Sequence, residues 1–198
     1  MEAILAFDMA VFRFVEEHLW CPALDAVMVT VTTLGDGGLI WIALGVVLLF
    51  FRNYRKFGIM IFVALLFSLI INDNILKPLI ARPRPFDLDA WKGTFVYPEL
   101  ITRPSSLSFP SGHSSSSIAA AVVLLFSKNK KLGIPVLVFA LLMAFSRIYV
   151  HVHYATDVFA GIVAGTVYAL LAVLLVSRLE PLIKAKIAAA REKKKPGV

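Results

Sequence analysis

The sequence predicts an all-α integral membrane protein: a six-helix core bundle with an amphipathic interfacial helix at its N-terminus. Its 198 residues are 59% hydrophobic and only 17% charged, and the mean hydropathy is +0.82, far more apolar than a soluble domain. Apolar runs of about the length of a membrane span recur along the chain, and basic residues gather between and after these runs. The length is that of one domain, so residues 1–198 are predicted to form a single membrane domain.

The first 20 residues predict a helix that lies in the membrane interface. Apolar and charged side chains are mixed there in an amphipathic pattern. The apolar ones are Ile4, Leu5, Phe7, Val11, Phe12 and Val15, and the charged ones are Asp8, Arg13, Glu16 and Glu17. The next segment, 22–34, is apolar but short and contains Asp25. We interpret it as a shorter first helix of the core.

Five further apolar runs predict membrane-spanning helices, because about 20 residues cross a bilayer. These runs are 37–52, 57–77, 111–127, 131–150 and 155–178. The last span contains Gly161-Ile-Val-Ala-Gly165, a GxxxG motif that favours close helix packing.

The distribution of lysine and arginine predicts the orientation. Three basic residues fall at 52–56, three at 128–131, and seven from Arg178 to the end. Alternating spans place all three groups on one face, which the positive-inside rule makes cytoplasmic. The long loop 78–110 and the turn 151–154 then face outward, and the basic tail 179–198 contacts anionic lipid headgroups.

Three polar clusters lie on this outward face: Lys77–Pro85, Phe109–His113 and Ser146–Asp157. Ionisable residues near a bilayer are costly and are usually functional. One arginine there could be an interfacial anchor, but three clusters on one face are more simply explained by a site.

The chemistry of these clusters points to phosphate. Lys77, Arg84 and Arg147 supply three positive charges, and the arginines can make forked contacts to phosphoryl oxygens. Ser111 offers a hydroxyl, and Gly112 leaves a backbone N–H accessible where a helix begins, a favourable place for an anion. The carboxylates of the loop are scattered, so we expect no metal and no other cofactor.

Two histidines are predicted to have separate roles. His153 and Asp157 are four residues apart, so one helical turn would place the carboxylate under the ring. A carboxylate on one ring nitrogen leaves the other free to attack phosphorus. We therefore expect His153 to be the nucleophile. His113 is then the general acid and base, and His151 is the rival nucleophile.

These clusters resemble the signature of the type 2 phosphatidic acid phosphatase superfamily, which includes lipid phosphatases, glucose-6-phosphatase and vanadium haloperoxidases. The signature K-x6-R-P, P-S-G-H and S-R-x5-H-x3-D is matched in full, by Lys77 to Pro85, Pro110 to His113, and Ser146 to Asp157. The resemblance implies a six-helix membrane core, the phosphate-binding residues named above, and His153, Asp157 and His113 as catalytic residues. The short chain and outward site resemble the bacterial branch.

The expected function is hydrolysis of a lipid phosphate in the cytoplasmic membrane, through a phospho-histidine. The substrate could be undecaprenyl diphosphate, phosphatidylglycerophosphate or phosphatidate. Two rivals use the same residues: a phosphotransferase that passes phosphate to another acceptor, and a lipid-phosphate transporter, which would leave the histidines without a purpose. A haloperoxidase fits less well because the chain is so apolar. Nucleic acid is not an expected partner, and the oligomeric state is left open.

Overall fold

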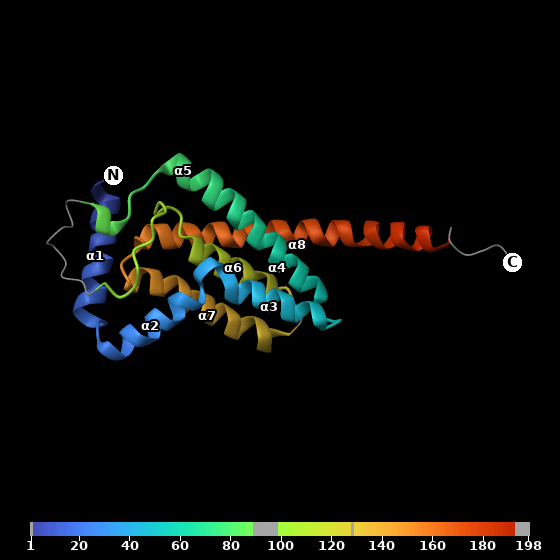
Figure 1. Cartoon of the computed structure of the whole chain (residues 1–198), viewed down its shortest axis with the longest axis horizontal. Helices are drawn as coiled ribbons and strands as arrows, with labels where there is room; N and C mark the ends of the chain where they lie inside the picture. Colours follow the sequence, from blue (N-terminus) through green and yellow to red (C-terminus); the bar gives the residue numbers. More distant parts are fainter. Residues whose placement is uncertain (1, 89–98, 128, 193–198) are drawn as a thin grey trace.

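The structure, a computed structural model, describes residues 2–88, 99–127 and 129–192, with the side chains of the last helix described to residue 190. Within these residues the chain forms helices and loops and no strand (Figure 1). The α-helices are α1 (Glu2–His18), α2 (Pro22–Leu34), α3 (Leu39–Phe50), α4 (Arg55–Phe67), α5 (Lys77–Ile80), α6 (Gly112–Leu125), α7 (Lys130–Tyr149) and α8 (Ala155–Glu192). The shorter elements are the 3-10 helices η1 (Asp36–Gly38) and η3 (Pro85–Asp87) and the π-helix η2 (Ser68–Leu76).

The helices are those of a membrane protein. Among the described residues, three helical segments are long and apolar enough to cross a bilayer: Arg55–Asp87, Lys130–Tyr149 and Ala155–Ala190. Helices α2 and α3, bent by 49° at the break between them, together supply a fourth candidate. The sequence predicted six core helices, whereas three or four segments of the described residues are long and apolar enough to cross a bilayer.

The difference lies partly in α6, which forms the predicted 111–127 run but is only 14 residues long. It lies inside the bundle, packed against α4, α7 and α8. Its side chains Ala119, Ala120, Ala121, Val123 and Leu124 are fully buried. The second half of α6, from Ile118 to Leu125, is apolar all round, which is typical of such a central position.

Helix α8 approaches α6 very closely through the predicted GxxxG motif. A Cβ atom added at Gly161 would lie 2.6 Å from the Ser111 carbonyl oxygen, and one at Gly165 would lie 2.3 Å from that of Ser115. Only glycine allows the two backbones to come this near. The motif therefore holds the start of α6 against α8.

Helix α4 continues through η2 into α5, so the predicted 57–77 span is longer than expected and contains a π-helical section. In η2, the buried Asn72 donates to the Ser115 Oγ (2.6 Å) and accepts from the Tyr168 hydroxyl (2.7 Å). The Ser68 and Ser115 hydroxyls are also bonded, at 2.8 Å. π-Turns are frequent at functional sites, and this network positions Lys77, the first residue of α5.

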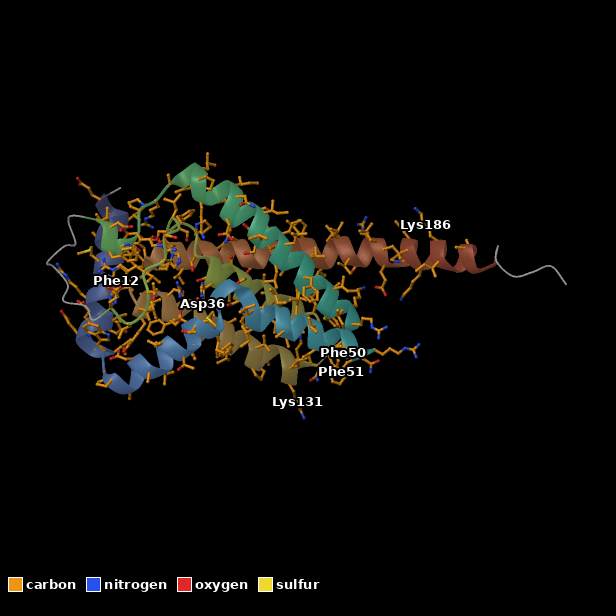
Figure 2. All side chains as sticks on the ribbon, viewed as in Figure 1. Phe12, Asp36, Phe50, Phe51, Lys131 and Lys186 are labelled. Carbon is orange, nitrogen blue, oxygen red and sulfur yellow. The ribbon has the colours of Figure 1, made fainter. Side chains whose placement is uncertain are left out.

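Helix α1 lies at one end of the bundle, and the C-terminal part of α8 runs out beyond the other end (Figure 1). The predicted tail 179–198 is thus largely a continuation of α8, up to Glu192. Phe12 of α1 marks the first end, whereas Phe51 and Lys131 lie at the second (Figure 2). The basic turns and the basic tail therefore share one end of the molecule.

The outer faces of the spans are strongly apolar. Phe50 of α3 is 79% exposed, Val138 of α7 is 62% exposed and Phe159 of α8 is 68% exposed. Soluble monomers rarely expose such extensive apolar surface. These faces fit the hydrocarbon of a bilayer.

Candidate active site

His153 lies in the short loop between α7 and α8, within the predicted turn 151–154. Helix α8 begins two residues later, at Ala155, and the backbone N–H groups of Val152 and His153 both donate to the Arg147 carbonyl at 3.2 Å. Asp157, in the first turn of α8, still reaches the ring: its Oδ2 is 3.6 Å from His153 Nδ1. The contact forms because the loop folds back over the helix start, rather than through one helical turn.

Asp157 is fully buried and is held by several donors. Its Oδ2 accepts hydrogen bonds from the Ser108 hydroxyl at 2.5 Å and from the Tyr154 backbone N–H at 3.1 Å. Ser108 Oγ also lies 3.4 Å from His153 Nδ1. Ser108 was not predicted, because no spacing distinguishes it from its serine neighbours at 105 and 106.

The other ring nitrogen of His153 faces the basic residues. Its Nε2 is 3.3 Å from Nη1 of Arg84, and Arg84 is anchored by the Val152 carbonyl (2.6 Å) and by the Ser106 carbonyl (2.5 Å) and hydroxyl (3.0 Å). Burial, reinforced by the nearby arginines and lysine, lowers the pKa of His153 well below its ordinary value. The imidazole is therefore neutral, the form that can act as a nucleophile.

Four of the five predicted phosphate-binding residues come together around one pocket of about 500 Å³. Its walls include Lys77, Arg84, Gly112, His113, Arg147 and His153. Arg147 is buried at the end of α7 and donates to the Thr32 hydroxyl. Lys77 is paired with Asp73 at 2.5 Å, so a carboxylate of η2 holds the lysine beside the pocket.

Ser111, the fifth predicted phosphate-binding residue, lies at the start of α6. It does not line this pocket, is fully buried, and its Oγ accepts from the Ser114 hydroxyl at 2.9 Å and caps α6. Its backbone N–H donates to the Asp157 carbonyl at 3.1 Å. The side chain thus supplies the cap that a helix N-terminus needs. The backbone bond ties the start of α6 to the start of α8.

His113 also lines the pocket and is held from the bend between α2 and α3. Its Nε2 lies 3.1 Å from the Asp36 carboxylate and 3.2 Å from the Thr32 carbonyl. Gly35 packs against the ring, since a Cβ there would lie 2.7 Å from its Cδ2. Asp36 was not predicted as a site residue, because it lies far away in the sequence, at the bend between α2 and α3.

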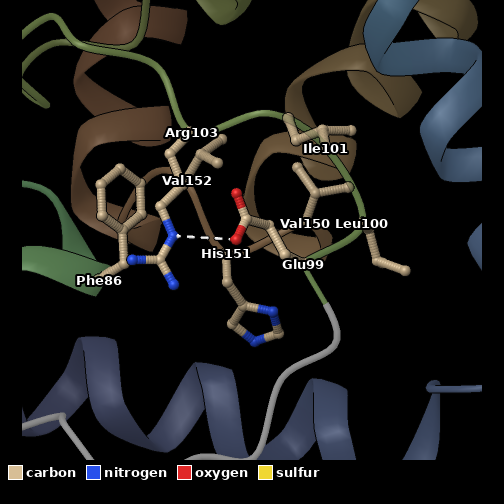
Figure 3. Close-up of a pocket in the computed structure, with 8 residues that line it drawn as sticks. All are labelled: Phe86, Glu99, Leu100, Ile101, Arg103, Val150, His151 and Val152. Atoms are coloured by element: carbon tan, nitrogen blue, oxygen red, sulfur yellow. Dashed lines mark ion pairs between the residues drawn. The ribbon is translucent and has the colours of Figure 1, made fainter.

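His151, the rival nucleophile, points away from the phosphate pocket. Its ring lies 4.8 Å from that of Phe12, and it borders a separate small pocket with the ion-paired Glu99 and Arg103 (Figure 3). Burial lowers the pKa of His151 to about 3. The structure therefore separates the two loop histidines, and only His153 lines the pocket with the three basic side chains.

The same pocket has an apolar wall. Beside the charged residues it is lined by Ile42 of α3, by Phe62, Leu65 and Leu66 of α4, and by Leu69 of η2. Within the described part of the chain, no group of three or more His, Cys, Asp or Glu side chains is arranged to hold a metal ion. The site thus joins a cluster of basic side chains to an apolar surface.

A neutral histidine backed by a carboxylate and faced by three basic side chains defines a site suited to phosphoryl transfer. The model of the PAP2 superfamily matches residues 57–181, and the chain belongs to this superfamily. The resemblance drawn from the three motifs is thereby confirmed.

Relatives match most of the chain. It is 28% identical to an undecaprenyl-diphosphatase of Sulfolobus acidocaldarius, over 93% of this chain and 88% of that protein. It is 31% identical to the undecaprenyl-diphosphatase BcrC of Bacillus subtilis, over 73% of this chain and 70% of that protein. The crystal structure of a PAP2-type phosphatidylglycerolphosphate phosphatase from Bacillus subtilis has a TM-score of 0.71 and 27% identity, covering 90% of this chain and 88% of that one.

Proposed function

We propose that this chain is a lipid phosphatase that hydrolyses the terminal phosphate of a membrane lipid through a phospho-histidine intermediate on His153. The observation that carries the proposal is the pocket itself. It brings His153 together with Lys77, Arg84 and Arg147, and it has an apolar wall beside them. A lipid phosphate is the class of ligand that matches both surfaces.

The first step is attack on phosphorus by the Nε2 lone pair of His153. The N–P bond forms as the bond from phosphorus to the leaving oxygen breaks, and that oxygen takes a proton from His113. Asp157 stabilises the positive charge on the ring through Nδ1. Lys77, Arg84 and Arg147 neutralise the charge on the phosphoryl oxygens, as preorganised cations do in phosphoryl transfer.

The second step is hydrolysis of the intermediate. The now neutral His113 takes a proton from water, the water oxygen bonds to phosphorus, and the N–P bond breaks. Inorganic phosphate leaves, and both histidines return to their starting protonation states. The Asp36 carboxylate lies 3.1 Å from His113 Nε2, where it can orient the ring for these proton transfers.

The membrane arrangement follows from the two ends of the bundle. The basic turns and the extended part of α8 lie at the end opposite to α1 (Figure 2), which supports a cytoplasmic basic end and an extracytoplasmic site in the cytoplasmic membrane. On α1, Ile4, Phe7 and Phe14 are each more than half exposed, which supports an interfacial helix. The bent α2–α3 pair and the short α6 would complete a six-helix core within one domain.

This orientation can be tested with single cysteines in a Cys21→Ser background. Thr102→Cys, on the outward loop, should react with an impermeant thiol reagent in intact cells. Lys186→Cys, on the extended part of α8, should react only after the membrane is opened, and the reverse pattern would contradict the orientation. The basic end is also expected to contact anionic headgroups.

The substrate we favour is a prenyl diphosphate. Two of the relatives, matched over most of both chains, are undecaprenyl-diphosphatases, and phosphatidylglycerophosphate is the second candidate because of the structural neighbour. Phosphate release should be measured with purified protein on undecaprenyl diphosphate, phosphatidylglycerophosphate and phosphatidate, with Asp157→Asn as a reduced-activity control. Release from undecaprenyl diphosphate at the highest kcat/KM is expected. Binding of these lipids without release would contradict the proposal and favour a transporter.

A further inference from the structure

The carboxylate of Asp157 divides its two oxygens between two neighbours. Oδ2 faces Ser108 and His153, whereas Oδ1 accepts a hydrogen bond from Nη1 of Arg82 at 2.6 Å. Arg82 lies two residues before Arg84, at one of the six unspecified positions of the K-x6-R-P motif. It is therefore a contact of the catalytic carboxylate that the motifs do not indicate.

Arg82 is held in turn by Asp8 of α1. Nη2 of Arg82 donates to Asp8 Oδ2 at 2.7 Å, and the guanidinium carbon lies 3.7 Å from the centre of the Tyr154 ring. Arginine is suited to such a bridge, because its planar fork can bind two carboxylates at once while its face stacks on an aromatic ring.

Asp8 is fully buried and also binds the first turn of α8. Its Oδ1 accepts from the Thr156 backbone N–H at 2.9 Å, and its Oδ2 accepts from the Thr156 hydroxyl at 2.8 Å. A helix N-terminus favours a carboxylate in this position. One side chain of α1 therefore fixes both Arg82 and the residue next to Asp157.

A carboxylate that orients a catalytic histidine must be charged and correctly rotated. Asp157 is buried, so an adjacent cation is needed to favour its charged form. Arg82 supplies this cation on the side away from His153. Because Arg82 holds Oδ1, the other oxygen stays directed toward the ring.

We infer that Asp8 and Arg82 are positioning residues for catalysis: they hold Asp157 in the geometry that orients His153, and α1 thereby forms part of the active site. This inference rests on the proposed function, in which His153 is the nucleophile. It also changes the interpretation of α1, whose Asp8 the sequence pattern would place among its water-facing charges.

The test compares Asp8→Asn and Arg82→Lys with matched controls in the full-length protein. Glu17→Gln makes the same change as Asp8→Asn at an exposed site of α1, and Arg13→Lys matches Arg82→Lys. Steady-state kinetics on the lipid phosphate give kcat and KM, and competitive inhibition by inorganic phosphate reports the binding pocket separately. Asp157→Asn is the reference for loss of the catalytic carboxylate.

Both Asp8→Asn and Arg82→Lys should lower kcat by about 10- to 100-fold, because displacements of about 1 Å cost rates of that order. KM and the phosphate inhibition constant should stay within about threefold, since neither residue lines the phosphate pocket. Lysine keeps the positive charge but cannot bridge two carboxylates. A low kcat in Arg82→Lys would therefore show that the bridging geometry is needed, and not the charge alone. The exposed controls should resemble the unaltered protein.

Two results would overturn the inference: wild-type kcat in Asp8→Asn or Arg82→Lys, or a parallel loss of kcat and phosphate affinity, which indicates general disruption. If Asp8→Asn does not fold, Arg82→Lys alone decides in the same way. Wild-type kcat in Asp157→Asn would instead refute the proposed function. If kcat falls in Asp157→Asn but in neither Asp8→Asn nor Arg82→Lys, only the positioning role of Asp8 and Arg82 is refuted.

Discussion

The close contact between α6 and α8 makes Gly165→Ala an informative perturbation. The added Cβ would lie 2.3 Å from the Ser115 carbonyl oxygen, whereas ordinary contacts begin near 3.4 Å. The two helices must therefore separate locally by about 1 Å, because the obstructing atom belongs to the backbone and has no rotamer to escape into.

The magnitude follows from this displacement. Overpacking by one carbon costs about 1–3 kcal/mol of stability, which corresponds to roughly 2–4 °C in Tm for each kcal/mol in a chain of this size. Activity should suffer more. Helix α6 begins with Gly112 and His113, while α8 begins beside His153, so their separation moves the acid away from the nucleophile. A misplacement of about 1 Å can cost about 100-fold in rate.

The assay is thermal unfolding in detergent together with kcat on the best lipid phosphate. Val163→Ile is the matched control, because it adds one carbon to the same helix at a side chain that is 49% exposed. The control should leave both Tm and kcat unchanged. If Gly165→Ala also leaves both unchanged, the close packing of α6 against α8 and its role in aligning the histidines are refuted.

Three further predictions address the site and its surroundings. Ser108→Ala removes the 2.5 Å bond to Asp157 and should lower kcat about tenfold at constant KM in initial-rate assays; an unchanged kcat would leave that hydroxyl without a catalytic role. Because burial lowers the pKa of His151 to about 3, the unfolded chain gains a proton below pH 6.5 that the folded chain does not. The free energy of unfolding should therefore fall by about 2 kcal/mol between pH 7 and pH 5 from this group. His151→Asn should flatten that pH dependence, and equal slopes in both proteins would contradict it. Phosphate release should persist in EDTA, and complete loss restored by Mg²⁺ would contradict a mechanism that relies on arginine and lysine.

The chemical residues were largely predictable, because motif spacing carries chemistry directly. Lys77, Arg84, His113, Arg147 and His153 line one pocket, as the three clusters indicated. The span boundaries also agree to within a few residues for α7, because a continuous apolar run leaves little choice of helix. The extension of α8 beyond residue 178 was not predicted. Its charged residues do not form the apolar pattern of a membrane span, although they are compatible with a helix.

The supporting residues were not predictable, for a physical reason. Asp36, Ser108 and Arg82 act through contacts between elements far apart in the sequence, and their residue types are common in loops. Asp8 was interpreted as part of a polar face because amphipathic patterns do not distinguish solvent from a buried counter-ion. The phosphate-binding role of Ser111 stays a prediction; the sequence did not indicate that its hydroxyl also caps α6, since a serine at a helix start suits both roles.

The most direct test of the mechanism is rapid-quench trapping of the phospho-enzyme with a ³²P-labelled aryl phosphate, followed by peptide mapping. The account predicts transient label on the peptide that contains His153 and none in His153→Ala. In His113→Ala the label should accumulate, because a good leaving group needs no acid in the first step but water still needs a base in the second. Label that persists in His153→Ala, or that disappears only in His151→Ala, would contradict His153 as the nucleophile.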